Sequence, residues 1–63
     1  GPSAVERARA ASADGRAQEV RSLLEARVKA GKGNTEEVRL VMAACKAMRD
    51  SACVEDIKKT LPP

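Results

Sequence analysis

Three short turn signals divide this chain into four segments of helical character, and this division constrains the fold more than any other feature. The signals are Asp14-Gly15, Gly31-Lys32-Gly33 and Arg49-Asp50. Glycine readily adopts the left-handed backbone conformation that ends a helix. Between the turns, β-branched residues never alternate with polar ones as a strand would require. With twelve alanines among many Glu, Arg, Leu and Lys residues, the pattern predicts an all-α fold of four short antiparallel helices.

The first two helices are expected over residues about 4–13 and about 16–30. Ser3 followed three residues later by Glu6 fits a capping box at the start of the first helix. In the second helix, apolar residues recur at i, i+3, i+4 and i+8, which places them on one helical face. These residues are Val20, Leu23, Leu24 and Val28.

The third and fourth helices are expected over residues about 35–49 and about 52–60, with Asn34 and then Asp50 or Ser51 as the caps. The third helix is apolar on two sides, which indicates packing between two neighbours, or between one neighbour and a ligand. Its main face carries Val38, Val41, Met42, Cys45 and Met48, and the other side carries Leu40, Ala43, Ala44 and Ala47. In the fourth helix Val54, Ile57 and Leu61 are aligned, and Pro62-Pro63 ends it.

The helices are expected to pair as two hairpins, residues 4–33 and residues 34–61. Gly1-Pro2-Ser3 looks like the scar of a removed purification tag, so we expect a piece excised from a longer protein. The apolar stock is thin, with no Phe, Trp or Tyr, and this predicts a staple or a neighbour that completes the core. No apolar run approaches the roughly 20 residues of a membrane span, and we expect no secretory leader.

The two hairpins are weakly similar to each other. A shift of 34 residues superimposes Val20 on Val54 and Leu23 on Ile57, and it also places Ala8 on Met42 and Ala11 on Cys45. The sequence resembles the tetratricopeptide repeat, a helix-turn-helix unit of that period, over nearly the whole chain. The runs that carry the resemblance are residues 15–20 with 23–25, residues 34–38 and residues 50–54. It implies two degenerate repeats in right-handed stacking, with Ala11, Ala17 and Leu24 at positions where the family places bulky aromatic residues.

The residue types that support catalysis or metal binding are scarce. No His occurs, which removes the commonest general base and the commonest metal ligand. Two cysteines cannot supply a four-ligand zinc site, and Gly31-Lys32-Gly33 does not follow the pattern of a phosphate-binding loop. We therefore expect no catalytic site, no metal site and no cofactor.

The cysteines admit two interpretations. Cys45 lies near the end of the third predicted helix and Cys53 near the start of the fourth, so an antiparallel hairpin can bring them within disulfide distance. They are either paired buried thiols, which imply the cytoplasm, or a disulfide, which implies an extracytoplasmic setting. We expect a cytoplasmic protein unless Cys45 and Cys53 form a disulfide.

The leading functional hypothesis is a non-catalytic module that binds a segment of another protein. The tetratricopeptide resemblance implies a groove between the first and third helices. The basic residues of this groove favour an acidic partner, because they can make charge-assisted hydrogen bonds to carboxylates. Leu40 is either the main contact for the partner or a core residue packed on the second helix. The partner-binding residues carried over onto this chain are Arg9, Arg39, Leu40, Ala43 and Lys46.

Two further hypotheses compete with the groove. One is a docking or dimerisation bundle in which a second copy completes the thin core. The other is a helix-turn-helix binder of nucleic acid, for which the fourth helix offers mainly Lys58 and Lys59. Charge argues against the latter, because the 12 basic and 9 acidic residues are interspersed and no aromatic residue is available for stacking. We expect no membrane partner.

Overall fold

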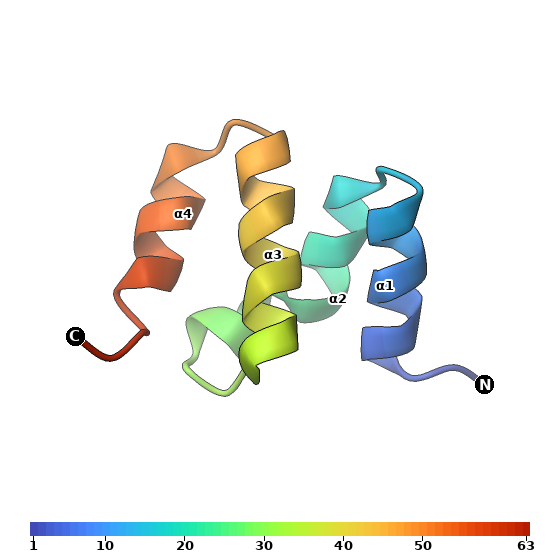
Figure 1. The fold of residues 1–63 in the computed structure, drawn as a ribbon, viewed down its shortest axis with the longest axis horizontal. Helices are drawn as coiled ribbons and strands as arrows, with labels where there is room; N and C mark the ends of the chain where they lie inside the picture. The colour runs from blue at the N-terminus through green and yellow to red at the C-terminus, as the bar shows by residue number, and fades with distance from the viewer.

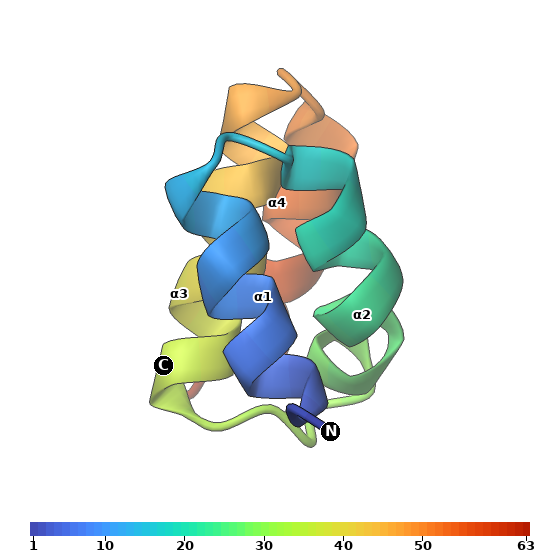
Figure 2. The ribbon, with the colours of Figure 1, turned by 90° about the vertical axis from the view of Figure 1, so that its right-hand side faces the viewer.

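The chain folds into four α-helices without any strand, so the predicted all-α class is confirmed. The computed structural model describes residues 1–63. The helices are α1 (Ala4–Ala13), α2 (Ala17–Lys29), α3 (Thr35–Ala47) and α4 (Ser51–Lys58). Each helix reverses the direction of the one before it, and α3 stands between α4 and the α1–α2 pair (Figure 1). The view from the side shows α1 in front of α3, with α2 alongside (Figure 2).

Side-chain caps fix where three of the helices begin, with Ser3 before α1, Asn34 before α3 and Asp50 before α4. The Glu6 backbone N–H donates to Ser3 Oγ at 3.2 Å, and the Ser3 N–H donates back to the Glu6 carboxylate at 3.1 Å. Asn34 and Glu37 make the same reciprocal pair at the start of α3, both bonds measuring 2.8 Å. Such boxes satisfy donors that have no partner within the helix. From the sequence we attributed Ser3 to the scar of a purification tag, but in the structure Ser3 caps α1.

The first three helices end in the same backbone motif. A residue with positive φ follows each C-cap: Gly15 at 74°, Gly31 at 76° and Arg49 at 55°. At each end one N–H donates three residues back and the next donates five residues back, as in Arg49 to Lys46 and Asp50 to Cys45. This is a Schellman motif, which favours glycine at the left-handed position. Arg49 therefore holds a conformation that costs a side-chain-bearing residue free energy.

The core consists of aliphatic side chains, small residues and the two cysteines. From α1 it takes only alanines, Ala8 and Ala11, which are fully buried and let α1 approach its neighbours closely. The larger cluster joins Ala8 to residues of α2, α3 and α4, namely Leu24, Val28, Val41, Cys45, Cys53 and Ile57. The smaller cluster is Ala11, Val20 and Ala44. Leu40 packs against both clusters.

The predicted ends of the last two helices were too long. The third helix was expected to reach residue 49 but stops at Ala47, because Arg49 turns into the left-handed region. The fourth was expected to reach residue 60 but stops at Lys58, where the chain changes to i→i+3 bonds and the Thr60 hydroxyl donates to the Ile57 carbonyl at 2.8 Å. Leu61 consequently lies outside the core with 43% of its surface exposed. No helix has the length and apolar character needed to cross a membrane.

Candidate functional site

The outward face of α3 carries most of the sequence-predicted binding residues. A shallow hollow lies between this face and the C-terminal turn. Arg39, Ala43 and Lys46 were predicted from the sequence, and apolar neighbours flank them. We call this hollow with its rim the α3 surface, and its lining residues are Val38, Arg39, Met42, Ala43, Lys46 and Leu61.

A second hollow opens on the other side of α3, toward α1. Its lining residues are Thr35, Glu36, Arg39, Leu40 and Ala43. Arg39 and Ala43 border both hollows because they lie on the outermost ridge of the helix. The structure thus brings Arg39, Leu40, Ala43 and Lys46 together on one helix.

Arg9 is placed differently from the other four residues. Its guanidinium donates from two nitrogens to the two carboxylate oxygens of Glu36, each at 2.6 Å, and lines none of the hollows. This fork ties α1 to α3 across the predicted groove. The hydrogen bonds raise the pKa of Arg9 and lower the pKa of Glu36. The charge of Arg9 is therefore already matched within the chain.

Leu40 combines the two roles between which the sequence did not decide. It is half-buried and packs against both core clusters, and it also borders the hollow toward α1. The buried part packs against the clusters that contain the small α1 residues Ala8 and Ala11. Substituting Leu40 therefore disturbs the core as well as the surface, which makes Ala43 the better position for a surface test.

The cations of the α3 surface differ from most others in having no acidic partner. The ion pairs engage Arg9, Arg16, Arg21, Arg27, Lys29, Lys58 and Lys59. Arg39, Lys46 and the adjacent Arg49 belong to none of them. By contrast Lys58 and Lys59, on which a nucleic-acid hypothesis depended, lie 3.3 Å from Glu55 and 3.8 Å from Asp56.

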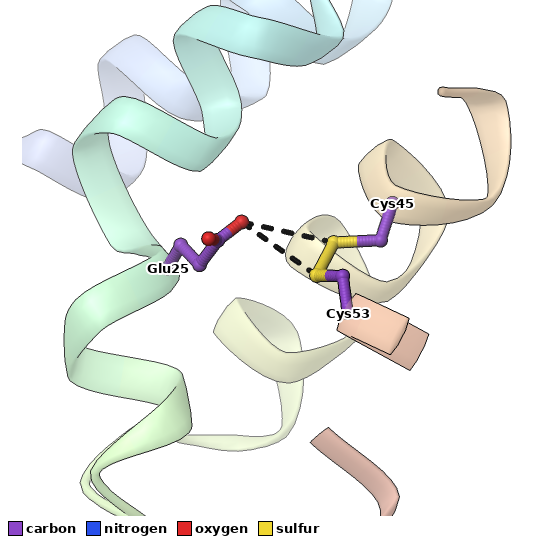
Figure 3. A group of neighbouring side chains, drawn as sticks. All are labelled: Glu25, Cys45 and Cys53. Atoms are coloured by element: carbon purple, nitrogen blue, oxygen red, sulfur yellow. Dashed lines mark hydrogen bonds between the residues drawn. A yellow bond between two sulfur atoms is a disulfide. The ribbon is translucent and has the colours of Figure 1, made fainter. Parts of the chain in front are cut away.

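The second candidate is a buried cluster around Cys45 and Cys53. The two residues are joined by a disulfide, with their Cα atoms 5.9 Å apart, and both are buried. Oε1 of Glu25 lies 3.8 Å from Sγ of Cys45 and 3.6 Å from Sγ of Cys53, as the dashed lines in Figure 3 mark. Since a disulfide carries no S–H, these contacts become hydrogen bonds only when a cysteine is reduced.

Basic side chains hold Glu25 in its ionised form beside the disulfide. Arg21 donates to its carboxylate, and Lys29 lies 3.3 Å from Oε2. The bond from Arg21 outweighs the effect of partial burial and lowers the pKa of Glu25. Arg21 also donates to Asp50 at 2.9 Å, which connects α2 to the cap of α4.

The cluster has ligand atoms close enough for a metal ion, since one atom each of Glu25, Cys45 and Cys53 lies within 4.8 Å of the others. Metal binding requires thiolates, however, and a disulfide offers none. Arg21 and Lys29 also occupy the carboxylate oxygens that a cation would need. In this form the cluster acts as a staple between α3 and α4, held against α2.

Sequence reasoning missed the apolar half of the α3 surface. Val38 and Met42 were assigned to the main core face and do pack against the larger core cluster, but they are half-buried and also line the hollow. Leu61 was aligned with the core of a longer fourth helix. The acidic-basic pattern of Arg21, Glu25 and Lys29 at i, i+4 spacing was a readable signal for the cluster.

Comparison of the chain with protein-family models, with curated proteins and with solved structures found no match. The functional interpretation therefore depends on the geometry of this chain.

Proposed function

We propose that this chain is a non-catalytic interaction module that binds a segment of a partner protein along the outward face of α3. The observation that carries the proposal is the position of Arg39 and Lys46, two cations without an acidic partner that border an apolar hollow. Surface cations usually find acidic neighbours in a chain of such mixed charge, as most of them do here. An interface with exposed apolar atoms and unmatched charge is suited to a complementary partner.

The repeat resemblance supports the same proposal. Two helical hairpins with a 34-residue offset are consistent with a degenerate tetratricopeptide-like pair, in which the first helix of each hairpin presents the binding surface. These helices correspond to α1 and α3. On the α1 side, the charges of Arg9 and Glu36 are already paired with each other and are not free to bind a partner. We therefore assign the partner-binding surface mainly to α3.

Dimerisation through the same surface is less well supported. A two-fold dimer presents the same patch on both copies, so Arg39 and Lys46 would lie close to the Arg39 and Lys46 of the second copy. Like charges at an interface disfavour association. A different protein that presents acidic residues to Arg39 and Lys46 avoids this repulsion.

The disulfide bears on where the module works. Because disulfides persist mainly in oxidising compartments, we propose an extracytoplasmic setting for the oxidised chain. Thiol trapping in intact cells tests this part. Recovery of Cys45 and Cys53 as free thiols would restore the cytoplasmic alternative.

A displayed library of random peptides tests the binding function without a known partner. The purified chain is compared with the variant Ala43→Trp. Ala43 lines both hollows, so the bulky indole side chain obstructs them. The matched control is Ala26→Trp, an exposed alanine in the middle of α2 that borders neither hollow. We expect enriched peptides to bind the unmodified chain and Ala26→Trp but not Ala43→Trp. Enrichment that Ala43→Trp leaves intact, or no enrichment at all, contradicts the proposed function.

A further inference from the structure

The two sides of the ridge that Arg39 and Ala43 form on α3 differ in their unpaired charges and in their exposed apolar surface. On the α1 side, Glu36 is neutralised by Arg9, and Leu40 is packed into both core clusters. On the side of the C-terminal turn, Val38 and Met42 are half-buried, and Leu61 is 43% exposed. Both unpaired cations, Arg39 and Lys46, therefore border the hollow on the second side, whereas only Arg39 borders the hollow toward α1.

The spacing of the cations sets the shape of a complementary partner. Arg39 and Lys46 are seven residues apart on one helix, which places them two turns or about 10.5 Å apart along its axis. Met42 and Ala43 lie between them and line the hollow. A matching segment needs two carboxylates about 10 Å apart with an apolar side chain between them. A second helix lying along α3 provides this with acids at i and i+7 and Leu at i+3 or i+4.

From these observations we infer that the partner segment is an acidic amphipathic helix, seated along α3 on the side of Val38, Met42 and Leu61. The inference rests on the proposed function and specifies the partner of that site. Arg49, also without an acidic partner, extends the positive charge beyond Lys46 toward the start of α4. The formal net charge of +3 adds long-range attraction for an acidic segment.

A pair of synthetic peptides tests the inference directly. The first is an Ala-Gln helix with Glu at i and i+7 and Leu at i+3 and i+4, labelled with a fluorophore. The second is identical except that Lys replaces each Glu. In fluorescence anisotropy at low salt, we expect the chain to bind the Glu peptide and to bind the Lys peptide at least about tenfold more weakly, because two ion pairs become two repulsions.

Charge reversal on the chain itself locates the contact. Arg39→Glu with Lys46→Glu should weaken binding of the Glu peptide at least about tenfold and make the Lys peptide the better ligand. The matched control is Arg7→Glu with Lys32→Glu, which changes the net charge by the same amount at two cations that belong to no ion pair and line no hollow. The neutral pair Arg39→Gln with Lys46→Gln serves if the reversed pair loses its helical circular dichroism. It should bind the Glu peptide more weakly than the unmodified chain does and discriminate less between the two peptides.

Each outcome is decisive. Equal weakening by the control pair indicates attraction by net charge alone and overturns the assignment to α3. Binding of the Lys peptide by the unmodified chain, or peptides of no net acidity recovered from the random library, overturns the acidic partner but leaves the proposed function standing. Loss of the Ala43→Trp effect in the library overturns both.

Discussion

Reduction of the Cys45–Cys53 disulfide is expected to remove a large share of the stability of this domain. The bond closes a loop of sequence separation 8 between α3 and α4. In the chain-entropy description, a loop of that length contributes about 2.5 kcal/mol by restricting the unfolded chain. A chain of 63 residues typically has a total stability of about 3–9 kcal/mol. A domain without aromatic residues depends on such a constraint more than most.

The assay is urea unfolding at pH 7, followed by helical circular dichroism, with and without a phosphine reductant. We expect the reductant to lower the free energy of unfolding by about 2.5 kcal/mol and the thermal midpoint by about 10–20 °C. Titration should find no free thiol before reduction and two afterwards. Because the disulfide ties α3 to α4, which leads into the C-terminal turn that carries Leu61, affinity for the acidic peptide should fall as well.

The double variant Cys45→Ala with Cys53→Ala is the control. It should be insensitive to the reductant, and less stable than the reduced chain because two buried sulfur atoms are also lost. A chain that shows two titratable thiols in reductant and yet unfolds at an unchanged urea concentration would exclude a stabilising role for the disulfide.

Three further perturbations test the helix ends and the carboxylate of Glu25. Asn34→Ala removes the cap of α3 and should lower the free energy of unfolding by about 1 kcal/mol; an unchanged urea midpoint would show that the capping box is not formed. Arg49→Gly relieves the left-handed residue and should raise stability by about 1 kcal/mol, seen as a rise of about 4–8 °C in the thermal midpoint; a fall would contradict the Schellman assignment. Folding lowers the pKa of Glu25, so its contribution is complete above its unfolded pKa and is lost as the pH falls through the folded pKa. We therefore expect urea midpoints to fall below about pH 4, less steeply in Glu25→Gln, and an identical acid profile in that variant would exclude Glu25 as a source of the pH dependence.

The sequence predicted the number, class and approximate bounds of the helices because those depend on local signals. Ser3 and Asn34 are caps in the structure, as expected, and of the two candidates for α4 the cap is Asp50. The ends at Ala47 and Lys58 were misjudged because nothing in the residue type of Arg49 announces a positive φ. Local periodicity also continues through Leu61, although the backbone does not.

The site was harder to predict because it depends on tertiary pairing. Arg9 and Arg39 look equivalent in the sequence, but only Arg9 meets Glu36 across the helix boundary. Likewise, whether Leu40 faces a ligand or the core depends on how closely the alanines of α1 approach. Residue types suggested a charged interface, and the fold decided which charges remain free.

The central claim is that the free face of α3 receives another polypeptide, and amide chemical-shift mapping tests it most directly. The isotope-labelled chain is titrated with the Glu peptide. We expect the amide signals of Arg39, Ala43 and Lys46 to move in a saturable manner while the signal of Ala26 stays in place. Movement confined to α2, or a spectrum unchanged at saturating peptide, would contradict it.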